Sequence, residues 1–324
     1  NINIGITDFL EITVGLRYEK EQNRIDRRTY FDYNGTLPNP VPDALKATLG
    51  FLNSSDTSRY EINSEFLSHK YAMIFNLPHG NLYANITSGY HGGGFNTGNN
   101  KKVPYYDNEN TWNYEFGYKG LFFNNRLRTN ICVFHIDWLN QQLLVVGDLS
   151  TPFQTISNAG KSAISGFELE LEGIVAEGLS FNFSFGYLDA KITDYRFSDK
   201  INGRDTVIDY SGNKIPFSPD FNSNLIIKYE FPFKLFDYQS NWASNISFKF
   251  IDSYYSSHVN LFKTDPRLLV NLKTGINFEN YELAFWINNI FDLYYVYGTY
   301  EYRGGQNAVF GSPRTFGLNF NVFY

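Results

Sequence analysis

The last ten residues of the chain place the strongest constraint on its fold, because apolar and polar side chains alternate there up to Val322 and the chain ends on an aromatic residue. The apolar set is Phe316, Leu318, Phe320, Val322 and Tyr324, and the polar or small set is Thr315, Gly317, Asn319 and Asn321. Period-two alternation predicts a β-strand whose side chains project to two opposite faces. One apolar face and one small, polar face are typical of a strand that separates lipid from a wet lumen.

The same alternation recurs along the whole chain, and turn signals separate its segments. In residues 167–172, for example, one Phe and two Leu side chains alternate with three glutamates. The clearest segments cover 10–19, 67–77, 82–90, 112–119, 167–172, 179–187, 221–229, 242–250, 268–278 and 283–287. With the last segment and the less regular stretch 127–145, the sequence predicts about twelve strands. Several of them exceed the usual five or six residues.

The connections between these segments alternate in length. Short turns are expected near 78–81, 123–126, 175–178, 233–239 and 279–281, and longer polar segments near 29–59, 95–109, 146–161, 196–216, 255–265 and 292–312. Short turns on one rim and long loops on the other are typical of a transmembrane β-barrel, whereas a soluble sandwich does not sort its loops in this way. The predicted fold class is therefore all-β, an antiparallel transmembrane barrel.

Composition excludes several other classes of protein. Aromatic residues make up 19% of the chain, yet the mean hydropathy is −0.34 and no run of 18 apolar residues exists, which argues against a helical membrane span. The single cysteine, Cys132, rules out a disulfide framework and a thiolate metal cluster. A net charge of −6 argues against a nucleic-acid partner.

No pattern in the sequence indicates an enzyme or a resident cofactor. The five histidines are scattered without metal-ligand spacing, and no Ser-His-Asp set, phosphate-binding loop or zinc signature is present. We therefore expect no catalytic residues, no bound metal and no cofactor.

Several segments resemble the C-terminal half of TonB-dependent outer-membrane receptors, of the siderophore-receptor type. The similar segments are Asn110–Gly120 (NTWNYEFGYKG), Asn125–Asp137, Asn158–Glu170 (NAGKSAISGFELE), Gly178–Ala190, Asn288–Tyr295 (NNIFDLYY) and Gly311–Gly317 (GSPRTFG). Their order and spacing match the family over nearly the entire chain. The last strand, which ends on an aromatic residue, also resembles the closing strand of bacterial outer-membrane barrels.

The resemblance implies that residues 1–324 are one domain, the C-terminal part of a barrel of about 22 strands without its plug domain. The first predicted strand (about 9–28) and the last (315–324) should then lie apart. It also implies a location in the bacterial outer membrane, in contact with its lipid. The implied protein partners are a TonB-type energy-coupling complex, through the missing plug, and the barrel-assembly machinery, through the terminal aromatic strand.

Three functions are compatible with these observations. The resemblance favours energised uptake of a scarce iron chelate, a ferric siderophore. Uptake of cobalamin or a glycan by the same type of receptor stays open, as does a passive specific porin, because loop sequences set the choice of solute. A barrel enzyme is disfavoured, since no histidine has an Asp or Ser partner at suggestive spacing.

Two loops contain the aromatic, basic and glycine residues that suit a flat, polar and often anionic ligand. The candidate ligand-binding residues are Tyr90, His91, Tyr105 and Tyr106 in one loop, and Tyr300, Tyr302 and Arg303 in the other. The alternative is that these tyrosines belong to an aromatic girdle at the membrane surface.

Charged residues within the predicted strands should find partners in the lumen. The ladder of Glu168, Glu170 and Glu172 requires cations or water beside it, and Arg314 is expected to pair with a lumen carboxylate.

Overall fold

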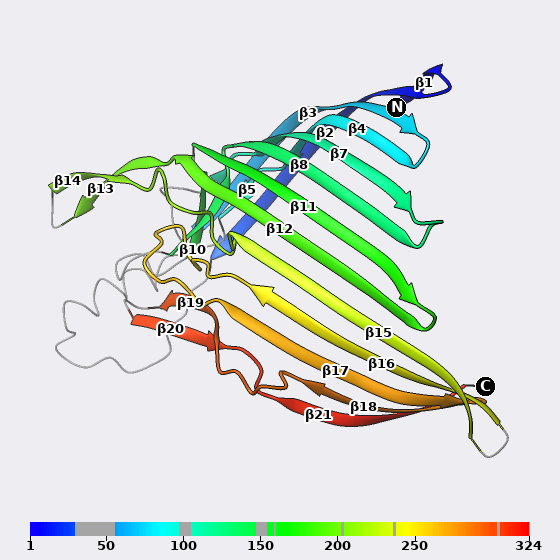
Figure 1. Cartoon of the computed structure of the whole chain (residues 1–324). Coiled ribbons are helices and arrows are strands. Elements are labelled where there is room, and N and C mark those ends of the chain that lie inside the picture. Colours follow the sequence, from blue (N-terminus) through cyan, green and yellow to red (C-terminus); the bar gives the residue numbers. More distant parts are fainter. Residues whose placement is uncertain are drawn as a thin grey trace, which may run out of the picture.

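The computed structural model describes residues 1–29, 56–96, 105–146, 154–158, 160–201, 204–235, 238–302 and 305–323. In these ranges every regular element is a β-strand, and no helix is long and apolar enough to cross a membrane. Thirteen strands form one curved antiparallel sheet (Figure 1). They are β1 (Ile2–Thr7), β2 (Leu10–Thr29), β3 (Asp56–Leu77), β4 (Gly80–His91), β7 (Glu109–Phe122), β8 (Leu127–Leu139), β11 (Lys161–Ala176), β12 (Leu179–Asp194), β15 (Phe221–Leu235), β16 (Tyr238–Ile251), β17 (Arg267–Phe278), β18 (Tyr281–Asn288) and β21 (Thr315–Val322).

The sheet order follows the chain order, so each strand pairs with the next strand of the sheet along the sequence. β1 and β21 form the two edges and lie far apart in Figure 1, which leaves the sheet open, as predicted for the two ends of the chain. The expected first strand corresponds to β2. One strand more than expected is present because Ile2–Thr7 folds back onto β2, with Ile4 opposite Ile12.

The two rims of the sheet differ as the sequence predicted. Within the described residues, the short-turn rim has connections of a few residues, such as Pro78–His79 and Glu279–Asn280. The long connections are not wholly irregular, because they contain four two-stranded hairpins: β5 (Gly94–Phe95) with β6 (Tyr105–Tyr106), β9 (Gln142–Val146) with β10 (Gln154–Asn158), β13 (Arg196–Ile201) with β14 (Arg204–Asp209), and β19 (Val296–Tyr302) with β20 (Gly305–Phe310).

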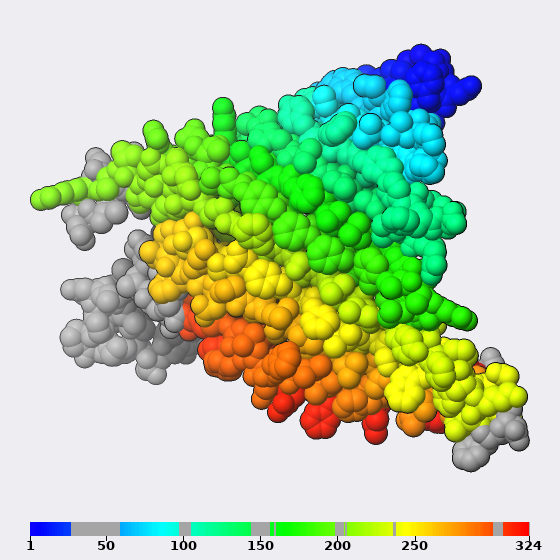
Figure 2. Space-filling model, viewed as in Figure 1, coloured from blue at the N-terminus to red at the C-terminus, as the bar shows by residue number. Residues whose placement is uncertain are grey.

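Strand register aligns the apolar side chains of successive strands on one face of the sheet. One such row crosses nine strands through Ile4, Ile12, Met73, Ala84, Phe116, Val133, Phe167, Tyr187 and Phe221. On the last strand the apolar side chains are uncovered, with Phe316 69% and Leu318 72% exposed. Figure 2 views the sheet from one side, and aromatic rings are visible along its green strands. An uncovered apolar face of this extent is the face that contacts lipid.

Aromatic side chains border this apolar face at both rims. Toward the long loops His69 stacks on Trp112 with ring centroids 5.6 Å apart, and toward the short turns Tyr281 stacks on Phe320 at 6.0 Å. On β7, Trp112 and Phe122 mark the two levels, and the strand between them spans roughly 34 Å at about 3.4 Å per residue. A strand tilt of about 40° reduces this to a height of roughly 25 Å, which matches the apolar band of an outer-membrane barrel.

The opposite face of the sheet is polar, so the wall has no continuous apolar core. The buried apolar cluster lies instead at the long-loop rim, where Leu143 of β9 packs with Ala190 and Ile192 of β12. Tyr195 and Ile215, from the connection that follows β12, complete the cluster. The long loops therefore pack on one another and on the strand ends, and this packing positions the loops that carry the predicted ligand-binding residues.

Candidate functional site

The connections from β4 to β7 and from β8 to β11 are joined by side-chain amides. Asn96 donates from Nδ2 to the carbonyl oxygen of Ile156 (2.9 Å) and accepts from the Ile156 amide at Oδ1 (2.7 Å). Asn158 makes the equivalent pair of bonds with the backbone of Asp107, both at 2.9 Å. Each amide thus replaces one step of a β-ladder, so the two loops form one unit.

Gln142 and Glu109 anchor this unit to the barrel wall. The backbone amide of Gln142 donates to Oε2 of Glu109 (2.7 Å), and its side chain donates to the carbonyl oxygens of Gly92 (3.0 Å) and Asp107 (3.2 Å). His91 lies 3.6 Å from the other oxygen of Glu109 and is itself exposed. An exposed imidazole therefore stands beside a half-buried carboxylate at the barrel mouth.

The first set of predicted ligand-binding residues lies in or beside this unit. Tyr90 stacks face to face on the buried ring of Phe66, with centroids 3.5 Å apart. Tyr105 is 52% exposed, whereas the phenol end of Tyr106 packs against Gly94, where a Cβ would otherwise lie. Of these residues, His91 and Tyr105 present the most accessible surface.

The second set belongs to another group of loops, built around Arg267 at the start of β17. The guanidinium is only 4% exposed and lies between the rings of Tyr254 and Tyr295, 5.2 and 5.1 Å from their centroids. Its Nη2 donates to the Tyr254 hydroxyl (3.0 Å), and that hydroxyl donates to the carbonyl oxygen of Tyr297 (2.5 Å). Nε and Nη1 have no hydrogen-bond partner among the residues that the structure describes. A buried cation with two unpaired donors thus lies beneath these loops.

The hairpin β19–β20 sits above this cation. The amide of Thr299 donates to the Ser256 hydroxyl (2.9 Å), and Tyr300 is 54% exposed. Tyr302 lies within β19, but its side chain falls outside the described part of the structure, as does all of Arg303. The structure therefore places one of the three predicted residues of this loop, Tyr300, on an accessible surface.

No hydrogen bond, ion pair or ring contact between described residues joins the two groups of loops. The first group binds to the connection between β8 and β11, and the second to the connection between β16 and β17. A single site that uses both loops stays a prediction.

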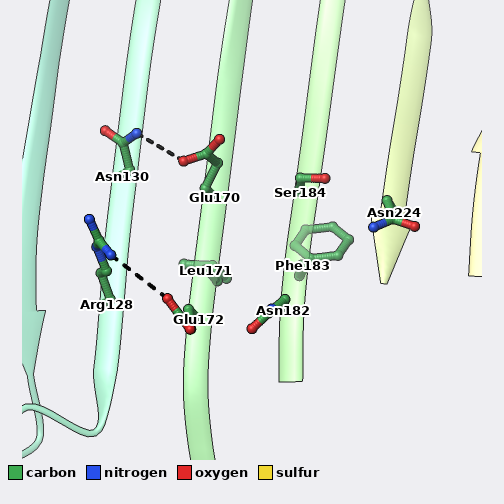
Figure 3. Close-up of a pocket in the computed structure, with 9 residues that line it drawn as sticks. All are labelled: Arg128, Asn130, Glu170, Leu171, Glu172, Asn182, Phe183, Ser184 and Asn224. Carbon is green, nitrogen blue, oxygen red and sulfur yellow. Dashed lines mark hydrogen bonds and ion pairs between the residues drawn. The ribbon is translucent and has the colours of Figure 1, made fainter. Parts of the chain in front are cut away.

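The inner face of the wall carries paired charges where the glutamate ladder was predicted. A hollow of about 290 Å³ is lined there by side chains of β8, β11, β12 and β15. Figure 3 shows these side chains. Glu172 lies 3.9 Å from Arg128, Glu170 accepts from Asn130 (3.1 Å), and Cys132 donates weakly to Glu168 (3.7 Å). The predicted cation is therefore found beside Glu172, whereas the partners of Glu170 and Glu168 are an amide and a thiol rather than a cation. Arg314 likewise pairs with a carboxylate, that of Asp292, at 3.8 Å.

Sequence reasoning missed the residues that organise the loops. Asn96 and its partner Ile156 are 60 positions apart, and no local pattern connects them. Arg267, which follows Pro266 at the start of a strand, carries no signal that separates it from an exposed arginine. Among the described residues no three His, Cys, Asp or Glu side chains converge as metal ligands.

The comparisons with known proteins agree with this architecture. The sequence model of the family described as "TonB dependent receptor-like, beta-barrel" matches residues 1–290. The chain belongs to this family. Like its relatives, this TonB-dependent receptor barrel is a protein of the bacterial outer membrane.

Relatives with similar sequences are named as receptors. A probable TonB-dependent siderophore receptor, PiuA, of Acinetobacter baumannii is 24% identical over 201 residues, which cover 58% of this chain and 26% of PiuA. The pesticin receptor of Yersinia pestis is 22% identical over 326 residues, which cover 98% of this chain and 42% of that receptor. The chain thus spans less than half the length of these relatives.

Solved structures show the same fold. The ferric yersiniabactin uptake receptor FyuA of Yersinia pestis superimposes with a TM-score of 0.77 at 17% identity, over 98% of this chain and 43% of FyuA. The siderophore receptor PiuA superimposes with a TM-score of 0.72 at 21% identity, over 99% of this chain and 42% of PiuA.

Proposed function

We propose that the chain forms part of the wall and mouth of an outer-membrane receptor that takes up a ferric siderophore. The observation that carries the proposal is the likeness of nearly the whole chain to the fold of FyuA, which is named as an uptake receptor for a ferric chelate. Energy for transport would come from a TonB-type complex acting on a part of the receptor outside this chain. Nothing in the described loops resembles a nucleotide site.

The loops 90–106 and 294–303 supply the ligand-binding surface in this proposal. Tyr105 and Tyr300 offer exposed rings, His91 offers an exposed imidazole, and Arg303 supplies positive charge. Beneath the second loop, the buried guanidinium of Arg267 adds a positive field that stays in place when the exposed side chains move. Stacking, cation–π and charge-assisted contacts of this kind suit a flat anionic chelate.

The triple variant Tyr300→Ala, Tyr302→Ala, Arg303→Ala tests the second loop. Each exposed cation–π contact is worth about 0.5–1 kcal/mol, so the three changes together should remove about 2 kcal/mol, which is roughly a thirtyfold loss of siderophore affinity. The measurement is equilibrium binding of the radiolabelled ferric chelate to the intact receptor in outer-membrane vesicles.

A matched control changes two tyrosines and one cation at the opposite rim: Tyr229→Ala, Lys234→Ala, Tyr238→Ala. These side chains are exposed near the short turns, so affinity should stay within about twofold of the parent receptor. Equal losses in both triple variants would show that the loop does not contact the ligand.

Growth under iron starvation identifies the solute. A strain that lacks the gene should fail on one ferric siderophore of a panel and recover when the intact gene is supplied. Equal growth on every iron source, with a defect on cobalamin or a glycan, would refute the siderophore proposal and leave the receptor fold standing. Uptake that continues after the proton-motive force collapses would indicate a passive porin.

A further inference from the structure

A cavity of about 430 Å³ opens at the long-loop rim between the connections that precede β15 and β17. Its walls include Lys214, Asp220, Tyr255, Asn260 and Lys263. Reciprocal bonds fix its shape, because the amide of Lys214 donates to Oδ1 of Asn260 (2.7 Å) while Nδ2 of Asn260 donates back to the Lys214 carbonyl oxygen (2.9 Å). None of these side chains takes part in the loops assigned to siderophore binding.

The alternation of β12 places this cavity on the outer side of the wall. Phe183, Phe185 and Tyr187 point to the lipid face, and Asp189 and Lys191 follow on the same face two and four residues after Tyr187. The change from apolar to charged side chains marks the membrane surface.

The strand register relates Asp189 to the aromatic border at the long-loop rim. Asp189 pairs across the ladder with Ser165, which pairs with His135, and His135 pairs with Tyr114. The ring of Tyr114 contacts that of His135 at 6.3 Å within the upper aromatic border. Asp189 therefore lies in the same ladder row as a residue of the aromatic border, three strands away.

Lys214, which lines the cavity, forms ion pairs that connect the cavity to Asp189 near the end of β12. Its ammonium lies 2.9 Å from Asp189 and 2.7 Å from Asp220, so both carboxylates are neutralised from within the protein. Lys191 lies 2.9 Å from the other oxygen of Asp189. Lys263 lines the same cavity, so the named groups are three ammonium groups and two carboxylates, with a net charge of +1.

Lys263 provides that charge. The side chain is exposed and lies over the ring of Tyr255, 5.9 Å from its centroid, and forms no ion pair with any described residue. The hydroxyl of Tyr255 likewise has no hydrogen-bond partner among the described side chains. The Lys263 ammonium and the Tyr255 hydroxyl are therefore available to bind an oxyanion in the cavity.

Exposed apolar side chains adjoin the cavity. Leu261 and Phe262, directly before Lys263, are 64% and 45% exposed, and Phe217 is 59% exposed. Figure 2 shows the yellow-orange loop that carries Leu261 and Phe262 at the long-loop rim, on the side from which the aromatic rings of the wall are visible. A polar, cationic cavity with apolar side chains beside it, at the membrane surface, has the two-part character of a lipid site.

We propose that this cavity binds the phosphorylated headgroup of an outer-leaflet lipid. Lys263 and the Tyr255 hydroxyl bind the phosphate, the Lys214–Asp189–Asp220 cluster forms the rigid floor, and Leu261 and Phe262 contact the acyl chains. Tyr254 lines this cavity and also bonds to Arg267 and Tyr297, but Lys263 and Tyr255 take no part in the siderophore proposal, so variants at these two positions test the lipid site separately.

Native mass spectrometry of the intact, detergent-solubilised receptor tests the site. Diphosphoryl lipid A, whose headgroup carries phosphate on a glucosamine disaccharide, is titrated against phosphatidylcholine. Lipid A should be retained preferentially. Because a lysine near an anionic surface is worth about 1 kcal/mol, Lys263→Gln should lower the apparent affinity about fivefold.

The matched control is Lys249→Gln, which removes the same charge from an exposed lysine on the inner side of β16. It should leave lipid binding unchanged. Equal effects of the two variants, or equal retention of lipid A and phosphatidylcholine by the parent receptor, would overturn the proposal. Displacement of lipid A by inorganic phosphate at submillimolar concentration would also overturn it, because the site would then recognise free phosphate rather than a lipid.

Discussion

At the scale of single residues, the ion pairs of the inner wall contribute less to stability than the backbone of the turns. Arg128 and Glu172 are 73% and 62% exposed, and a pair so exposed is worth no more than about 1 kcal/mol. The turn between β11 and β12 depends instead on Gly178, whose φ of +71° lies in the left-handed region.

Gly178→Ala should therefore be strongly destabilising. The left-handed conformation costs an L-residue about 1–2 kcal/mol, and the new Cβ would overlap the carbonyl oxygen of Glu230, to whose amide the Gly178 carbonyl is already bonded. We expect a loss of about 3 kcal/mol in the free energy of unfolding of the intact receptor, measured by urea titration in lipid vesicles.

Gly212→Ala is the matched control, because its φ is +90° but no atom of another described residue lies within 4 Å of the added Cβ. It should cost only about 1 kcal/mol, the conformational part. Equal losses in the two variants would show that the contact with Glu230 contributes nothing.

At the scale of elements, local patterns predicted the strands but not the loops. Phe183 and Phe185 alternate with Asn182 and Ser184, and this period is visible without any knowledge of neighbouring strands. β1 was missed because its six residues are too short to stand out. The contact between loops was missed because partners such as Asn96 and Ile156 meet only in three dimensions.

His258 gives one loop a pH dependence. Its ring meets those of Tyr210 and Tyr195 edge-on, at 5.1 and 5.9 Å, and burial lowers the pKa of the imidazole below its ordinary value of 6.5. The unfolded loop then binds the proton more readily than the folded loop. The stability from neutral His258 is present above pH 6.5 and is lost as pH falls through that value toward the folded pKa.

Hydrogen exchange measures this effect on the loop amides bonded to β12. The amide of Gly212 donates to the Ile192 carbonyl oxygen (2.7 Å), so its protection, corrected for intrinsic exchange, should fall between pH 7.5 and 5.5. In the His258→Gln variant the protection should not change with pH. A parallel decline in both proteins would assign the effect to another group.

At the scale of the whole molecule, two properties define the wall. The outer face is apolar from β1 to β21, with aromatic borders roughly 25 Å apart, and the inner face carries amides and paired charges. Each strand between the two edges of the sheet is hydrogen-bonded to a neighbouring strand on both sides, as a membrane requires. The family match and the superposition on receptor structures support the same architecture.

Spin-label accessibility along β12 is the measurement that tests this architecture most directly. In the intact receptor carrying Cys132→Ala, single cysteines at Phe181, Asn182, Phe183, Ser184 and Phe185 are labelled in turn and reconstituted in lipid vesicles. We predict that collision with oxygen is high at the three phenylalanine positions, and that collision with a water-soluble nickel complex is high at Asn182 and Ser184. Accessibility that does not alternate, or oxygen maxima at Asn182 and Ser184, would contradict the assignment of the apolar face to lipid.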